Sequence, residues 1–338
     1  MKCLEGIVDS LKALNCVVST EEKSLSTTIF SKHVFLEHQK KVQNKHSIVF
    51  SLCDAKENKI LSQIVFSKKN SDEDFEFFAP ITGAFSDFYL INERIALKKL
   101  DLFLGYIERY LAVNYALKKL TYKLPPELYN SDNNNYLLNT MFNKGWKVNN
   151  IDLNYHLNII SEDYFRKKLS SSKKRELNRI TRENTTFTRV TEHDEIRSAY
   201  EVIKANRESQ GYPMTMSWEA LYSLYKAMPN DVYFFNLKSD NLIFASSICL
   251  KINEDHMYVF YWGENPEFRK LSPIVKLAEQ LYLFCVKEAF KTLDIGISTE
   301  NSSINQGLID FKINIGCELT KKISIEKILE KNNESRLS

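Results

Sequence analysis

The stretch from Tyr258 to Gly316 constrains the fold more than any other part of the chain. The protein has only nine glycines in 338 residues, and Gly263, Gly296, Gly307 and Gly316 all fall in this stretch. Each stands where one element's pattern ends, because glycine tolerates backbone conformations and close approaches that other residues do not. The pattern predicts a strand, a helix, a second strand and a second helix, the order of a ligand site at the carboxyl ends of strands.

The first of these helices is expected to open at Ser272 and Pro273. Serine is a good N-cap, and proline suits the first helical turn because its missing N–H would be unpaired there. Free N–H groups and the positive end of the helix dipole favour an anion at this point. Arg269 and Lys270 stand just before it, so this loop is either a phosphate site or a solvated surface loop.

Composition excludes several classes of protein. The formal net charge is only +3, so the overall charge of the protein does not indicate a nucleic acid or a membrane as a partner. The six cysteines form no CxxC pair and the six histidines show no metal spacing, so we expect reduced thiols and no metal. The longest charge-free apolar runs are about ten residues, short of the ~20 that span a bilayer. Glu5 and Asp9 interrupt any signal peptide, and we expect a soluble, cytoplasmic protein without membrane insertion.

Two parts of the chain share one order of predicted elements. Residues 47–126 and 231–298 each read as three strands, a glycine, a loop, a long helix and a strand, with Gly83 in the first corresponding to Gly263 in the second. The length also favours two domains over one. We therefore expect a duplicated domain, divided as 1–150, 151–330 with the active site, and a polar tail over 331–338.

A basic segment follows the expected boundary. Residues 164–184 contain eight Lys or Arg and two Glu, with the pattern of a helix or a helix pair. Such a segment is either a solvated face or a clasp for the phosphates of a tRNA or a nucleotide-linked substrate.

Polar side chains follow the second strand of the organising stretch. Asp294 stands between apolar neighbours, where a carboxylate costs free energy unless it is paired. It is either a structural hydrogen-bond acceptor or the base for an attacking amine or hydroxyl. Ser298, Glu300 and Asn305 come just beyond the strand, where they either contact a polar substrate or cap the loop.

Three motifs carry a resemblance to a known family. They are YWGENPEFRKLSP from Tyr261 to Pro273, LDIGIST from Leu293 to Thr299, and N-x-GL-x-x-FK-x-x-x-G from Asn305 to Gly316. Together with the order of elements, they resemble the Fem-type transferases, which have two GCN5-related N-acetyltransferase (GNAT) folds and add amino acids to peptidoglycan precursors. FFAPITG and KLPPELY resemble the N-terminal copy of uncharacterised double-acyltransferase proteins. The implied fold class is α+β: two tandem acyltransferase-like domains, each a mixed, mostly antiparallel sheet flanked by helices.

The resemblance also implies roles for particular residues. In this fold the strand ending at Tyr261, Trp262 and Gly263 splays from its neighbour, and a free backbone N–H there polarises the acyl carbonyl. Lys312 is expected to reach past the core edge into the cleft beside Asp294 and to contact a phosphate or a developing oxyanion. The donor-binding set that the resemblance implies is Tyr261, Trp262, Gly263, Arg269, Lys270 and Ser272.

The expected function is acyl transfer by direct attack. An acyl-CoA would supply the acyl group, and the amine or hydroxyl of a small acceptor, such as an amino sugar, would take it. The loop Arg269–Pro273 lacks the glycines of the usual pyrophosphate loop, and Fem-type proteins take their acyl group from aminoacyl-tRNA. Two alternatives therefore stay open: aminoacyl-tRNA-dependent transfer, and a non-catalytic module that binds a nucleotide or RNA.

Overall fold

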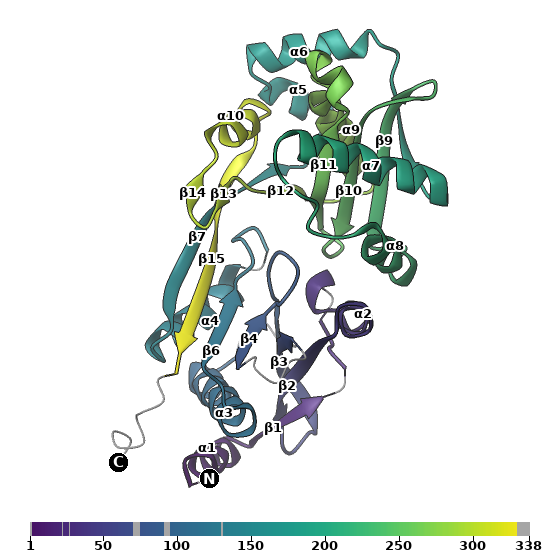
Figure 1. Ribbon diagram of the computed structural model, residues 1–338. Helices are drawn as coiled ribbons and strands as arrows, with labels where there is room; N and C mark the ends of the chain where they lie inside the picture. Colours follow the sequence, from purple (N-terminus) through teal and green to yellow (C-terminus); the bar gives the residue numbers. More distant parts are fainter. Residues whose placement is uncertain are drawn as a thin grey trace. The chain divides into compact units, whose positions relative to one another are not determined.

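The chain forms two compact units, which are shown in the computed structural model of Figure 1. The first unit runs to Ile151 and includes the last strand from Lys321, and the second is Asp152–Thr320. Residues 321–329, expected with the second domain, thus lie with the first, while the expected tail 331–338 lies outside the described residues. The structure describes residues 2–21, 23–26, 28–69, 75–90, 95–129 and 131–329.

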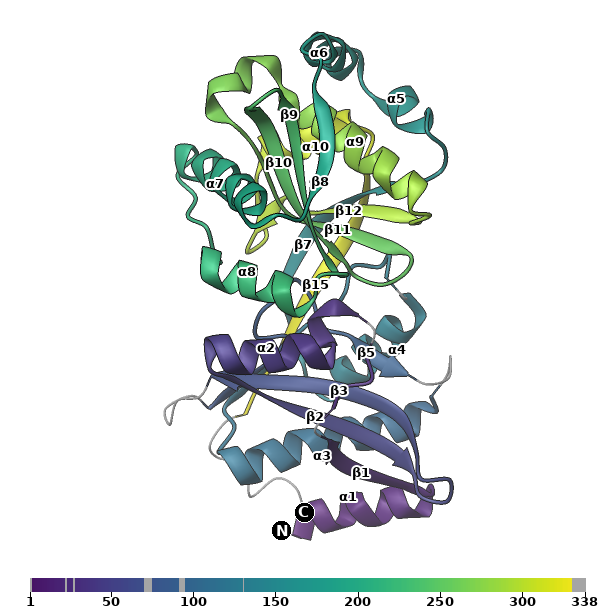
Figure 2. The same cartoon turned by 90° about the vertical axis from the view of Figure 1, so that its right-hand side faces the viewer.

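The first unit is a mixed sheet in the order β1-β2-β3-β4-β6-β15, with β5 beside β3. One face packs its alternate apolar residues, such as Phe50 and Phe66, against α1, α3 and α4. The other face carries Val49 and Val65, which pack with Leu36 of α2, so helices cover both faces (Figure 2). Its elements are α1 (Lys2–Ala13), β1 (Cys16–Glu21), η1 (Ile29–Ser31), α2 (His33–Gln43), β2 (Lys45–Asp54), β3 (Lys59–Lys69), β4 (Glu76–Ala79), β5 (Phe88–Leu90), α3 (Leu97–Tyr115), β6 (Lys119–Lys123), α4 (Ser131–Asn143) and β15 (Glu318–Ile328).

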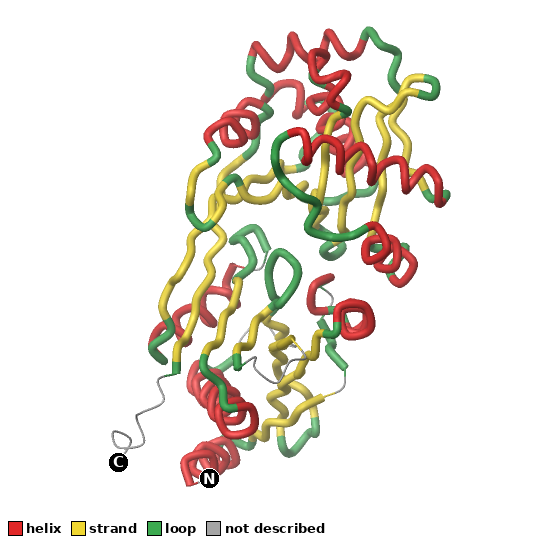
Figure 3. The backbone as a smooth tube through the Cα atoms, viewed as in Figure 1, coloured by secondary structure: helices red, strands yellow, loops and turns green. Residues whose placement is uncertain are grey.

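The second unit is a mixed sheet in the order β7-β12-β11-β10-β9-β8. Because neighbouring residues of a strand face opposite ways, Phe234 meets Tyr225 of α8 while Phe235 meets Phe284 of α9. Helices α7 and α8 therefore cover one face, and α5, α6 and α9 cover the other (Figure 3). Its elements are β7 (Lys147–Asn158), α5 (Tyr164–Lys168), α6 (Ser171–Thr181), β8 (Thr186–Val190), α7 (His193–Ser209), α8 (Trp218–Ala227), β9 (Val232–Ser239), β10 (Leu242–Lys251), β11 (His256–Glu264), η2 (Pro266–Leu271), α9 (Pro273–Lys287), β12 (Thr292–Ile297), β13 (Thr299–Glu300), β14 (Ser303–Ile304) and α10 (Gln306–Asn314).

The two units repeat one topology. In each, an antiparallel run of strands ends on a strand that pairs in parallel with the strand after a long helix: β4 with β6 around α3, and β11 with β12 around α9. Each of these later strands has an antiparallel neighbour on its other side, β15 beside β6 and β7 beside β12. The expected α+β class, with mixed and mostly antiparallel sheets flanked by helices, is confirmed.

Gly83 and Gly263, expected to correspond, hold different positions. Gly83 lies in the turn after β4 with φ +101°, and a Cβ there would lie 2.5 Å from the Phe30 ring. Gly263 lies within β11, and a Cβ there would lie 2.8 Å from the Asn206 Cβ. The first glycine therefore serves a turn, while the second allows a helix to approach a strand.

Candidate active site

The parallel strands β11 and β12 pair over a short distance and then part. Their pairing joins three residue pairs, from His256–Thr292 to Tyr258–Asp294. Beyond these pairs β11 continues to Glu264 and β12 to Ile297. Backbone groups that face such a gap are not used by a strand ladder, and a ligand can therefore hydrogen-bond to them.

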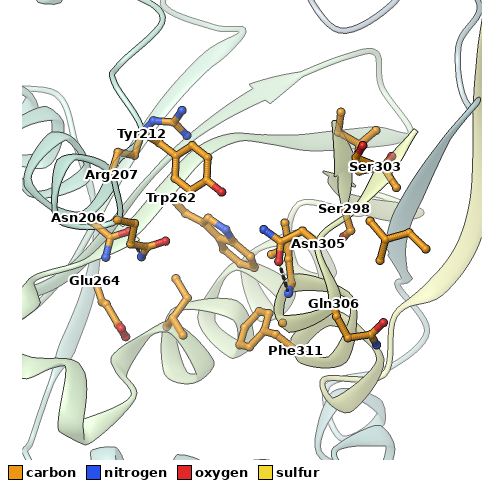
Figure 4. Close-up of a pocket in the computed structure, with 18 residues that line it drawn as sticks. Asn206, Arg207, Tyr212, Trp262, Glu264, Ser298, Ser303, Asn305, Gln306 and Phe311 are labelled. Carbon is orange, nitrogen blue, oxygen red and sulfur yellow. Dashed lines mark hydrogen bonds between the residues drawn. The ribbon is translucent and has the colours of Figure 1, made fainter. Parts of the chain in front are cut away.

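A pocket of about 890 Å³ lies where the strands part (Figure 4). Trp262 and Phe311 meet edge to face in its wall, with ring centroids 5.9 Å apart. Of the residues predicted from the sequence, Trp262, Gly263, Ser298 and Asn305 line it. The pocket takes its walls from α7, β11, the segment after β12, and α10.

Two buried polar atoms of residues that line this pocket have no partner among the described residues. They are the Nδ2 of Asn206, whose side chain belongs to a residue 7% exposed, and the Oγ of Ser298, a residue 1% exposed. Ser298 is held in place because its N–H donates to the Leu153 carbonyl at 2.8 Å and its carbonyl accepts from Asn305 at 3.0 Å. The sequence predicted Ser298 but missed Asn206, because nothing in a helical pattern marks one polar residue as facing a pocket.

Asp294 is buried in the sheet, and it does not line the pocket. Its Oδ1 accepts hydrogen bonds from Asn154 Nδ2 at 2.9 Å and from the Gly296 N–H at 2.8 Å. This geometry matches the structural role that the sequence left open. The role of Asp294 as a catalytic base stays a prediction, because a base must be within reach of the acceptor's amine or hydroxyl.

Lys312 is 1% exposed and lies in the core at the end of β12. Its Nζ donates to the carbonyls of Gly296 at 2.8 Å and Ile297 at 2.9 Å. Burial lowers the pKa of this amine to about 8, while Cys317 and Asp294 act in the opposite direction. The amine therefore reaches the end of β12, as the sequence predicted, but it does so inside the core and does not line the pocket. It holds the strand end that leads to Ser298.

The start of α9 differs from the expected anion site. Ser272 takes a left-handed conformation (φ 55°), and its hydroxyl accepts from Arg179 Nη2 at 3.0 Å instead of capping α9. The Ile274 N–H lies near the Glu264 carboxylate and helps to lower its pKa, and the Val275 N–H donates to the Ser272 carbonyl at 3.2 Å. Since proline has no N–H and the Val275 N–H is already paired, the start of α9 offers few free donors to an anion.

Glu264 therefore holds the place that an anionic ligand would take. Its side chain is 15% exposed, and burial raises the pKa of the carboxyl, while Arg269 acts in the opposite direction from 3.4 Å. Arg269 and Lys270 are both exposed, and Arg269 Nη2 also donates to Ser209 Oγ at 2.9 Å. The prediction that these two cations bind the donor stays a prediction, and the sequence analysis missed the carboxylate that pairs with Arg269.

The remaining predicted residues have the following places. The Tyr261 hydroxyl is hydrogen-bonded to that of Thr215, and the residue is 8% exposed. Asn305 Oδ1 caps α10 by accepting from the Leu308 N–H at 3.0 Å, while the residue also lines the pocket. The backbone of Glu300 pairs with Ser303, and its side chain lies outside the described residues.

The basic segment forms the two helices α5 and α6, as one of the sequence readings predicted. Arg166 pairs with Glu279 and Lys173 with Glu176. In the described part of the chain, no three His, Cys, Asp or Glu residues gather as metal ligands. No described helix is both long and apolar enough to cross a bilayer.

Comparisons with known proteins agree with this geometry. Residues 166–312 match the family model of the acetyltransferase (GNAT) domain. A search of curated proteins finds no match. Among solved structures, FemX has 12% identity and a TM-score of 0.68, over 88% of this chain and 91% of its own.

Two further structures share the fold. A tandem GNAT protein from the clavulanic acid biosynthesis pathway has 8% identity and a TM-score of 0.52, over 98% of this chain and 96% of its own. L-PGS from Bacillus licheniformis has 11% identity and a TM-score of 0.52, over 81% of this chain and 82% of its own. Residues 166–312 therefore match the GNAT domain model, and the chain as a whole shares its fold with FemX and with a tandem GNAT protein.

Proposed function

We propose that the protein is an acyltransferase that works at the gap between β11 and β12 by direct attack. The observation that carries this proposal is the parting of the two strands at a pocket within the GNAT domain. An amine or hydroxyl of the acceptor forms a bond to the acyl carbon, the bond from that carbon to the donor breaks, and the donor leaves with the proton. Positioning of the two substrates and hydrogen bonds to the acyl oxygen would supply the rate.

The structure gives reasons to prefer one class of acyl donor over another. An acyl-CoA of the usual kind would place its pyrophosphate on free N–H groups at the start of the helix after the splayed strand. Here the Glu264 carboxylate lies near the Ile274 N–H and pairs with Arg269, so a second anion at α9 would meet a carboxylate. The residues present do not fit a pyrophosphate at this point.

A donor in which an ester oxygen carries the acyl group fits these residues better. An aminoacyl-tRNA is such a donor, and it is the one that the Fem-type resemblance implies. Its phosphates could lie along the exposed cations of α6, outside the pocket, while only the ester end enters. We therefore favour an aminoacyl ester over acyl-CoA, with a small acceptor that carries an amine or hydroxyl.

Melting curves with candidate donors test this choice. A ligand that binds only the folded protein raises its melting temperature. We expect bulk aminoacyl-tRNA to raise it by several degrees and acetyl-CoA at millimolar concentration to leave it unchanged. Transfer from labelled aminoacyl-tRNA to hydroxylamine, a small generic nucleophile, should then exceed the rate without protein.

Glu264→Gln provides the matched variant. It keeps the size of the side chain and removes the negative charge at α9, so acetyl-CoA should gain a measurable effect on melting. A response of the wild-type protein to acetyl-CoA alone would contradict the donor choice. A response to tRNA without any acyl transfer would favour the non-catalytic binding module instead.

A further inference from the structure

The first unit has a groove of its own, which lies between α2 and the strands β1 and β2. Its volume is about 500 Å³, and α2 lies over the sheet beside it (Figure 2). All of the residues that line it belong to the first unit, so it is separate from the gap between β11 and β12. Its ionisable side chains are those of Glu21, Lys23, His33, Glu37, Lys40 and His46.

The charges of this groove balance each other without closing into pairs on α2. Two carboxylates and two amines line it. Glu37 and Lys40 are three residues apart on α2, yet neither forms an ion pair with a described residue. The same spacing does give ion pairs elsewhere, since Lys173 Nζ lies 2.8 Å from a Glu176 oxygen. The groove therefore has one carboxylate and one amine, side by side, that are available to a ligand.

Buried groups hold both sides of the groove in place. Leu36 of α2 packs against Val49 of β2, which fixes the helix on the sheet. On the other side, Gln63 is 1% exposed and holds the segment that carries Lys23. Its side chain accepts from the Leu25 N–H at 2.7 Å and donates to the Lys23 carbonyl at 3.3 Å. A ligand would therefore meet a groove that is already formed, which lowers the cost of binding.

The two charges on α2 indicate which class of ligand fits. Side chains three residues apart on a helix have Cβ atoms about 5–6 Å apart, so one small molecule can reach both. A simple anion would gain a contact with Lys40 but would be repelled by Glu37, and a simple cation would meet the opposite problem. A metal ion fits poorly, because no three His, Cys, Asp or Glu gather as ligands among the described residues.

We propose that this groove binds a free α-amino acid as its zwitterion, with the carboxylate at Lys40 and the ammonium at Glu37. The side chain of a small amino acid would lie against Leu36 and Val49, which also line the groove. This site goes beyond the proposed function. It belongs to the unit whose parallel strands β4 and β6 stay paired, and its ligand needs neither an acyl donor nor an acceptor.

The test uses L-alanine as the probe, with two twins that each lack one charged group. Propionate lacks the ammonium, and ethylamine lacks the carboxylate. Saturation-transfer NMR on the full-length protein measures the binding of each compound through the methyl group that all three share. We expect alanine to bind about ten-fold more tightly than either twin, because it alone makes both charge-assisted contacts.

Two variants separate the two contacts. Glu37→Gln and Lys40→Met should each weaken the binding of alanine about ten-fold. Glu37→Gln should leave propionate binding unchanged or stronger, and Lys40→Met should do the same for ethylamine, because each removes only the charge that repels that twin. A residue that only supported the fold would not give these opposite preferences.

Lys41→Met is the matched control. It removes the same charge one residue further along α2, from an exposed side chain that does not line the groove. Alanine binding should be unchanged in this variant. The melting temperatures of all three variants should stay near that of the wild type, since surface substitutions of this kind change stability little.

Three results would overturn the inference. They are no binding of alanine to the wild-type protein, binding of either twin as tight as that of alanine, or equal loss of alanine binding in Lys41→Met and Lys40→Met. If a variant unfolds, the comparison of the three compounds on the wild-type protein decides alone. Because the assay contains no acyl donor, failure of the proposed function would leave this inference standing.

Discussion

The two units share one topology but differ at their parallel strand pairs. In the first unit, β4 is four residues long, and all four pair with β6, from Glu76–Lys119 to Ala79–Tyr122. In the second, β11 is nine residues long and only three of them pair with β12. The same fold therefore has a fully paired parallel strand pair in the first unit and a partly separated pair in the second.

The difference indicates what the proposed acyl-transfer gap requires beyond the fold. Both strands must continue past their pairing, and something must hold the free strand end in place. Lys312 does this in the second unit by binding the carbonyls of Gly296 and Ile297, which adjoin Ser298. The first unit closes its corresponding position with the Ala79–Tyr122 pair, and both residues are fully buried.

Among the substitutions that test this difference between the units, removal of the Lys312 charge should have the largest effect on turnover. Lys312→Met keeps the length of the stem but leaves two carbonyls without their donor, so the end of β12 should lose its fixed position. We expect turnover to fall on the order of 100-fold, the scale of losing one preorganised electrostatic contact. Stability should fall by about 1–3 kcal/mol, measured by urea unfolding of the same variant.

Lys327→Met in the first unit is the control. Its Nζ pairs with Glu108, and the two side chains are 17% and 13% exposed. This variant should lose stability while its turnover per folded molecule stays near that of the wild type. Equal loss of turnover in both variants would mean that the contrast between the units does not decide catalysis.

The two glycines sharpen the comparison. In Gly83→Ala, the new methyl group would be strained by the left-handed φ and would clash with the Phe30 ring. We therefore expect the melting temperature to fall by several degrees, without a specific loss of ligand binding in the pocket. Gly263→Ala displaces Asn206 and should weaken ligand binding about ten-fold with a smaller change in melting. Melting curves of both variants, with and without aminoacyl-tRNA, check this. The reverse order of effects would refute the different roles assigned to them.

The smallest expected effect is a pH dependence of stability. The pKa of Lys312 is about 8 in the folded protein and 10.5 in the unfolded chain, so the unfolded chain binds the proton more tightly. The lysine therefore makes the free energy of unfolding rise as the pH increases from about 8 toward 10.5. Urea unfolding at pH 7.5 and 9.5 should show this rise in the wild type relative to Lys312→Met. Identical pH profiles would show that the amine is not desolvated.

Local patterns predicted the elements because their causes lie within a few residues. The 3.6-residue spacing of apolar residues and the Ser272–Pro273 pair located the start of α9, and strand periodicity located β11 and β12. The candidates Trp262, Gly263, Ser298 and Asn305 were found because they stand at element ends. Whether Ser272 caps its helix was beyond the sequence, since that depends on Arg179, which is 93 residues away.

The sequence by itself determined the class of fold, the shared order of the main strands and the long helix in each half, and the stretch that carries the pocket, while it missed β1 and β5. Periodicity, turn residues and glycine positions act over a few neighbours, and each of these features depends on them. Only the tertiary structure decided that Glu264 lies near the start of α9, that Lys312 lies in the core, and that Asn206 lines the same pocket as Ser298. The physical reason is that burial and pairing of a polar group depend on partners brought together by packing, and spacing along the chain does not encode which partners those are.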